Sequence, residues 1–190
     1  KLEAQQQGLP YDATAEDGEL NRTYGAEDQV FFTTDFLQDF GMLFVDVMPA
    51  DNSEILCVGF MADEIDSQIT ITPGTYEINA SGEVGTVMAS TGLTEDGYVT
   101  ETYFAAVTAE GGLALPLYFL VSGTVVVENV EGQFKMTVDA VNSNGIPVHI
   151  VYGNAASGVE NIDVNVVGVQ KQIVDGQLVI IRNGAEFNGI

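Results

Sequence analysis

Hydrophobic and polar positions alternate along most of this chain with the period of two that is typical of β-strands. In the segment from Gln133 to Ala140, Phe134, Met136 and Val138 alternate with polar residues. One face of such a strand packs on a core and the other faces water. The segments with this alternation, or with an apolar run rich in Val, Ile, Thr, Tyr and Phe, are Gln29–Thr34, Gly41–Met48, Glu54–Ala62, Thr75–Ala80, Val84–Ala89, Tyr98–Thr108, Leu115–Val121, Gly123–Val130, Gln133–Ala140 and Pro147–Tyr152.

Turn-forming residues separate these segments, among them Pro73-Gly74, Ser81-Gly82, Glu131-Gly132 and Asn144-Gly145. Such pairs favour tight connections between strands. Short strands at this spacing, with no helical stretch between them, indicate an antiparallel β-sandwich or a barrel-like meander. We therefore expect an all-β fold whose main antiparallel domain covers residues 29–153.

The two ends of the chain have a different character. Residues 1–28 are polar and lack a steady period, which predicts an extended acidic arm with room for one short strand near Leu20 to Tyr24. Residues 154–161 have the small side chains of a linker. Beyond them, Asp175-Gly176 and Asn183-Gly184 are strong hairpin turns, so we expect residues 154–190 to hold a linker and a small β-unit.

The tail from Val174 to Gly189 contains a short strand, an Asp-Gly turn, a hydrophobic strand that ends in Arg182, an Asn-Gly turn, an aromatic residue and a glycine. This order resembles the C-terminal sorting domain of type IX secretion in Bacteroidetes. The upstream residues 157–162 resemble the usual linker into that domain. The resemblance covers residues 157–190 and implies export to the outer-membrane surface or the medium, with the periplasm as the alternative.

The body of the chain has a looser resemblance, which rests on Ser122–Val127, on residues 132–140 and on residues 144–148. These stretches resemble β-rich surface and periplasmic proteins of the same bacteria, many of which have no assigned activity. This likeness implies a fold class and a location, but no reaction.

The charge of the chain is strongly one-sided, with 28 Asp and Glu against 5 Lys and Arg and a net charge of −23. Most of the excess lies in residues 29–154, where Lys135 is the one basic residue. This balance excludes nucleic acid as a partner and disfavours an anionic membrane surface. The chain also has no run of 18 apolar residues, so we expect no transmembrane segment.

A cation could use this negative charge, and calcium is the best candidate because it prefers oxygen ligands. Asp63, Glu64 and Asp66 form one acidic cluster that could bind it, although a solvated acidic loop explains the same residues. The cluster does not have the spacing of the twelve-residue calcium loop. We otherwise expect no cofactor.

No catalytic group stands out. The chain has one histidine, His149, which we expect on the surface of a sheet, and one cysteine, Cys57, which we expect to be a buried thiol. One Cys and one His cannot form an ordinary zinc site, and no phosphate-binding loop is present. A hydrolase that uses acidic residues alone is still conceivable, but no pair of carboxylates is distinguished from the others.

The most apolar stretch is Gly112–Val121, which is either a strand buried between two layers or part of the lining of a ligand cavity. On the second interpretation, the cavity would be lined by Leu115, Leu117, Phe119, Phe134 and Met136. The expected function is then a non-catalytic, secreted or cell-surface module that binds a small apolar molecule or a glycan. The alternative is a structural or adhesive, pilin-like subunit that uses its N-terminal arm for strand exchange. The sequence leaves the oligomeric state open.

Overall fold

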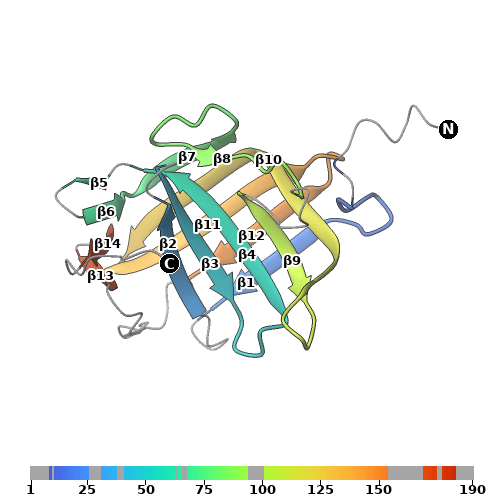
Figure 1. Ribbon diagram of the computed structural model, residues 1–190, viewed down its shortest axis with the longest axis horizontal. Coiled ribbons are helices and arrows are strands. Elements are labelled where there is room, and N and C mark those ends of the chain that lie inside the picture. The colour runs from blue at the N-terminus through green and yellow to red at the C-terminus, as the bar shows by residue number, and fades with distance from the viewer. Residues whose placement is uncertain are drawn as a thin grey trace, which may run out of the picture.

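The computed structural model describes residue 9 and residues 11–25, 31–37, 41–62, 64–65, 68–93, 101–153, 169–174 and 177–182 (Figure 1). For residues 31–37, 64–65, 68–70, 169–174 and 177–182 it describes the backbone alone. The described residues form β-strands, turns and bends and contain no helix. The predicted all-β fold is therefore confirmed, and none of the described residues form a helix that could cross a lipid bilayer.

The strands belong to two sheets. The larger sheet contains β1 (Leu20–Tyr24), β2 (Phe31–Leu37), β3 (Met42–Met48), β4 (Glu54–Met61), β7 (Gly74–Asn79), β8 (Val87–Met88), β9 (Tyr103–Val107), β10 (Leu113–Val130), β11 (Gln133–Asn142) and β12 (Pro147–Tyr152). The smaller sheet contains β5 (Glu64–Ile65), β6 (Gln68–Ile71), β13 (Val169–Val174) and β14 (Gln177–Arg182).

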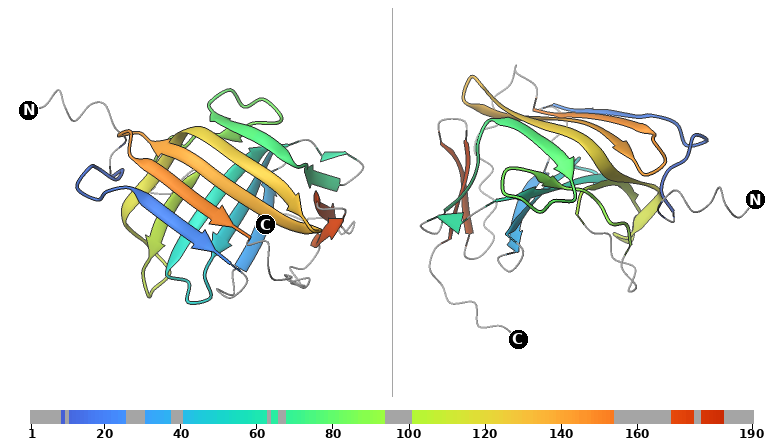
Figure 2. Two further views of the ribbon diagram at one scale, coloured as in Figure 1. Left: turned by 180° about the vertical axis from the view of Figure 1, so that it is seen from behind. Right: turned by 90° about the horizontal axis from the view of Figure 1, so that it is seen from above.

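The larger sheet closes on itself in part. Its strand order is β1-β12-β11-β10-β7-β8-β4-β3-β2, and β9 pairs with both β10 and β4. The strands β10, β7, β8, β4 and β9 therefore form a closed five-stranded barrel, to which the other strands are added. Figure 2 shows the result as two layers, with β1, β12 and β11 in one layer and β3 and β4 in the other.

The long strand β10 belongs to both layers. Its first half, Leu113 to Phe119, pairs with β9, and its second half, Gly123 to Val127, pairs with β7. At the start of the second half, Gly123 has a φ of 124°, and a Cβ atom there would lie 2.6 Å from the Cα of Ala140. A glycine is thus required where the chain passes from one layer to the other. Because β10 continues through this crossing, the two predicted segments 115–121 and 123–130 are parts of one strand.

Buried side chains from both layers form one main core between them. Val45 of β3, Phe60 of β4, Val125 of β10, Met136 of β11 and Ile150 of β12 are representative members. A second cluster lies on the other face of β9 and β10 and contains Ala105, Leu117 and Phe119. Because both faces of this part of the sheet are covered, β4 is a nearly continuous buried run.

Part of the predicted N-terminal arm belongs to the main sheet instead. The strand β1 pairs in parallel with β12, from Leu20 opposite Val148 to Tyr24 opposite Tyr152. Leu20 and Tyr24 are each 4% exposed, and Ala13 is fully buried. The short strand expected near Leu20 to Tyr24 is therefore present, and it is part of the main sheet.

The C-terminal strands do not form a sheet of their own. β13 pairs with β14, and β14 pairs with β6, with Leu178 opposite Ile71. Since β6 lies within residues 29–153, the expected boundary at residue 154 does not separate the two sheets. Residues 154–168 lie outside the described part of the chain.

Candidate functional site

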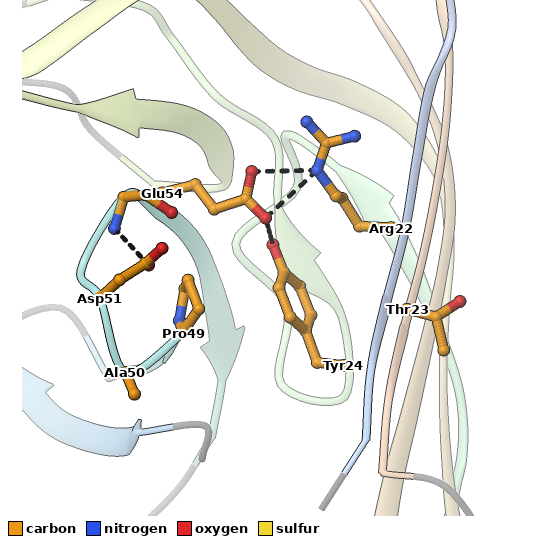
Figure 3. Close-up of a pocket in the computed structure, with 8 residues that line it drawn as sticks. Arg22, Thr23, Tyr24, Pro49, Ala50, Asp51 and Glu54 are labelled. Carbon is orange, nitrogen blue, oxygen red and sulfur yellow. Dashed lines mark hydrogen bonds and ion pairs between the residues drawn. The ribbon is translucent and has the colours of Figure 1, made fainter. Parts of the chain in front are cut away.

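A pocket of about 430 Å³ lies between β1 and the loop that joins β3 to β4. Figure 3 shows its surroundings. The residues that line it are Arg22, Thr23, Tyr24, Pro49, Ala50, Asp51, Ser53 and Glu54. Most of them can form hydrogen bonds through their side chains, so this is a polar pocket at one end of the two-layered body.

The carboxylate of Glu54 is the centre of the site. Nε of Arg22 lies 2.9 Å from Oε2 and 3.2 Å from Oε1 of Glu54, and the hydroxyl of Tyr24 donates to Oε1 at 2.6 Å. The Glu54 side chain is 18% exposed, which strengthens these charge-assisted bonds relative to bulk water. Because Arg22 and Tyr24 come from β1 and Glu54 from β4, the cluster links the two layers.

The strand period explains why Arg22 lies here. Leu20, Arg22 and Tyr24 share one face of β1, and the outer two are buried in the core. In Figure 3, Arg22 and Tyr24 point toward Glu54, whereas Thr23 points away.

Further contacts fix the guanidinium group. Nη1 of Arg22 donates to the carbonyl oxygen of Asn21 at 3.0 Å. The guanidinium carbon lies 5.5 Å from the centre of the Phe104 ring, within the range of a cation–π contact. The side chain of Arg22 is 42% exposed, so a ligand can still reach it.

The β3–β4 loop forms the opposite wall of the pocket. Its backbone turns at Asn52, which has a φ of 53° and donates its N–H to the carbonyl of Pro49 at 2.9 Å. The N–H of Ser53 donates to Oδ1 of Asp51 at 3.0 Å. Hydrogen bonds from the side chain and the backbone of Ser53 lower the pKa of Asp51, so this carboxylate is ionised at neutral pH and faces solvent.

This arrangement is suited to recognition by hydrogen bonding. It offers one guanidinium group, two carboxylates and the hydroxyls of Ser53 and Tyr24. The lining residues include neither histidine nor cysteine, which are the usual activators in nucleophilic catalysis. The imidazole of His149 and the thiol of Cys57 both lie outside this pocket.

His149 lies on the exposed face of β12, with Nδ1 2.5 Å from Oδ1 of Asp139 on β11. Cys57 is 5% exposed, and its burial raises the pKa of its thiol well above the usual value. The structure therefore keeps these two groups apart, one on the surface and the other as an inert buried thiol.

The five residues predicted to line a cavity have three different surroundings. Leu117 and Phe119 belong to the second cluster, Phe134 and Met136 to the main core, and Leu115 is 63% exposed. Alternation along β10 is the reason, since it points residues 117 and 119 away from the face that Phe134 and Met136 share. None of the five lines the pocket beside Arg22.

The calcium prediction falls largely beyond the described residues. Asp63 and Asp66 lie outside them, and for Glu64 in β5 only the backbone is described. Within the described part of the chain, no three side chains of His, Cys, Asp or Glu are grouped so that they could hold a metal ion. Calcium binding at residues 63–66 stays a prediction.

Arg22, Tyr24 and Glu54 do not stand out as site residues in the sequence pattern. One signal was present, because Arg22 is one of only five basic residues and alternates with Leu20 and Tyr24. The pairing with Glu54 spans 32 residues and depends on how the layers face each other. Compared with known proteins, the chain matches no family model, no curated protein and no solved structure.

Proposed function

We propose that this protein is a non-catalytic, secreted or cell-surface binding module, and that its pocket between β1 and the β3–β4 loop takes an uncharged, polyhydroxylated ligand such as a glycan. The observation that carries the proposal is the cluster of Arg22, Tyr24 and Glu54 in the wall of that pocket. These side chains offer a fixed set of donors and acceptors next to solvent.

The chemistry of the pocket favours hydroxyl groups as ligands. A hydroxyl can donate to the carboxylate of Asp51 and accept from an N–H of Arg22, whereas an apolar ligand uses neither. An anionic ligand would meet two carboxylates and one cation in the pocket, on a chain with a net charge of −23. An uncharged polyol satisfies the polar groups without this repulsion.

The pocket is also organised in advance of binding. Arg22 and Glu54 hold each other, and the β3–β4 loop is tied to β9 by the bond from the N–H of Val107 to the carbonyl of Ser53 at 2.8 Å. Ordering of side chains normally subtracts from the affinity for a ligand. A wall that is already fixed avoids much of this cost.

A screen of uncharged oligosaccharides, followed by calorimetry with the best ligand, tests the proposal. The variant Ala50→Trp fills the exposed mouth of the pocket and is expected to weaken binding by about tenfold or more, or ~1.4 kcal/mol. The matched control is Val84→Trp, because Val84 is 58% exposed and does not line the pocket. Failure of every uncharged glycan to bind, or equal binding by the two variants, would contradict the proposal.

The location is proposed on a separate basis, the resemblance of residues 157–190 to a sorting domain. Expression of the chain with and without these residues, in a bacterium that has type IX secretion, tests it by cell fractionation. We expect the intact chain at the surface or in the medium and the shortened chain inside the cell. The same distribution for both chains would count against this route of export.

A further inference from the structure

We call the described residues from Leu9 to Tyr24 the N-terminal segment. This segment binds to the rest of the molecule, here called the body, through long-range contacts. Its hydrogen bonds to the body join residues that are 30 to 134 positions apart in sequence. The contacts fall into three groups along the segment, and each group joins it to a different part of the body.

The first group surrounds the buried carboxylate of Asp12. Oδ1 accepts from the N–H of Phe119 at 3.0 Å and from Nδ2 of Asn142 at 2.9 Å. Oδ2 accepts from the N–H of Ser143 at 2.8 Å and from the Ser143 hydroxyl. The body thus provides four donors for one carboxylate of the segment, which is a specific receptor for it.

The second group is the pairing of β1 with β12. The five residues of β1 match Val148 to Tyr152 in parallel register, and Leu20 and Tyr24 enter the main core. β1 is at one end of the strand order, so it can leave without separating any other two described strands. An edge of this kind can accept any strand of the same sequence.

The third group is the bridge from Arg22 and Tyr24 to Glu54 in the opposite layer. It adds a charge-assisted anchor at the end of β1. With the carboxylate of Asp12 at the start of the segment, the two anchors fix both the position and the direction of the incoming strand.

We propose that this segment exchanges between copies of the chain, so that the N-terminal segment of one copy occupies the groove beside β12 of a second copy. The contacts are identical in the two arrangements, so their difference in free energy lies in the connection to β2 and in the freedom lost on association. Because every contact of the segment is kept, exchange of this identical element is a low-cost route to a dimer.

The exchange has a consequence for the pocket. Arg22 and Tyr24 would come from one copy, and Glu54 and the β3–β4 loop from the other. Each pocket of the exchanged dimer would then be completed by the partner copy. The inference does not depend on which ligand the pocket takes.

Cysteine cross-linking in the full chain tests the exchange. Asn21 and His149 are exposed register partners on β1 and β12, and neighbouring strands lie about 4.8 Å apart, which suits a disulfide. Equal amounts of Asn21→Cys and His149→Cys chains are unfolded together, refolded and oxidised. We expect a cross-linked heterodimer at about twice the 20.2 kDa of the chain, and little from chains mixed after refolding.

A matched mixture controls for chance collisions between sheet faces. Glu77 is also exposed and lies on β7 of the same sheet, so Asn21→Cys is mixed with Glu77→Cys in parallel. The heterodimer should form several times less in this mixture. Equal cross-linking in the two mixtures would overturn the proposal. The double variant, with Asn21→Cys and His149→Cys in one chain, shows whether the two positions can form a disulfide. If it cross-links internally while the mixture of single variants stays monomeric, exchange is also refuted.

A second measurement uses the unmodified chain, so that its result does not depend on disulfide geometry. Light scattering after refolding at increasing concentration is expected to show a growing dimer fraction. An excess of a synthetic peptide of residues 9–25 should return the mass to that of one chain, and a scrambled peptide should not. A strict monomer at every concentration, or a dimer that ignores the peptide, would refute exchange.

Discussion

Asp12 is a charged side chain that the fold has taken almost entirely out of water, with 6% of its surface exposed. Both oxygens of its carboxylate are used, each by two donors. Asn142 also donates to the carbonyl of Ala13, so the same side chain contacts two residues of the N-terminal segment. The position of the N-terminal segment therefore depends on these individual hydrogen bonds.

The substitution Asp12→Asn is expected to lower the free energy of unfolding by about 1–3 kcal/mol. Asparagine presents an amide donor where the carboxylate accepted, so at least one buried donor loses its partner. The urea midpoint should fall while the slope of the transition stays the same. The control Glu83→Gln makes the same kind of change at an exposed turn, and an equal effect there would show that loss of charge alone is responsible.

Gly123 is constrained by its backbone and by its neighbours. The substitution Gly123→Ala should destabilise the protein by more than about 2 kcal/mol, because it places a Cβ atom against the backbone of β11 at a positive φ. Thermal unfolding of this variant is compared with that of Gly74→Ala, another strand glycine with open space around it. A change within about 0.5 kcal/mol at position 123 would mean that β10 crosses between the layers differently.

Tyr152 provides a test of the core by pH. Burial raises its pKa from the usual 10 to about 12, so the unfolded chain loses this proton before the folded chain does. The stabilising contribution is complete below pH 10 and is lost as the pH rises from 10 to 12. Between pH 10 and 12, the free energy of unfolding should fall for the unsubstituted chain by up to about 3 kcal/mol more than for Tyr152→Phe. Parallel pH profiles of the urea midpoint for the two proteins would show that Tyr152 does not ionise on unfolding.

At the scale of elements, β1 is the strand with the largest consequences, because it contributes to the core, to the sheet edge and to the pocket. Its position in parallel with β12 brings residue 20 beside residue 148. If β1 is an integral part of the fold, its buried Leu20 should contribute as much to the free energy of unfolding as a leucine elsewhere in the core.

The variant Leu20→Ala tests this equivalence. It is expected to lower the free energy of unfolding by about 2–5 kcal/mol, since Leu20 is 4% exposed and its removal leaves a cavity. Leu113→Ala is the matched control, with a leucine that is 40% exposed at the start of β10. Similar small effects from both variants, measured by urea unfolding, would place β1 outside the cooperative unit.

Local patterns were sufficient for most of the strands. The expected segments 41–48, 54–62, 133–140 and 147–152 correspond to β3, β4, β11 and β12, because alternation and tight turns are properties of neighbouring residues. The pairing of β1 with β12 and of β14 with β6 could not be predicted, since it depends on contacts more than a hundred residues apart. Similarly, Arg22 became a site residue only through Glu54, which the sequence places in an unrelated segment.

At the scale of the whole molecule, the net charge of −23 sets the main electrostatic term. Among the described residues, Arg22 pairs with Glu54 and Lys135 pairs with Glu128. Because 28 Asp and Glu face only 5 Lys and Arg, repulsion among carboxylates opposes the compact state at low ionic strength.

Added salt should therefore stabilise this protein. We expect the melting temperature to rise between about 0.01 M and 0.15 M NaCl, over which the screening length falls from about 30 Å to about 8 Å. Differential scanning fluorimetry of the full chain measures it. A melting temperature that falls with salt would mean that the few ion pairs outweigh the general repulsion.

The parallel pairing of β1 with β12 also has a consequence for the order of synthesis. The groove for β1 does not exist until residues 148–152 have been made, which at cellular rates of translation is roughly 6 to 25 s after residue 24. During that interval Leu20, Tyr24 and the carboxylate of Asp12 have no place to bind on their own chain. Throughout this interval the nascent chain carries a strand without its partner, which is open to any factor that binds unfolded chains.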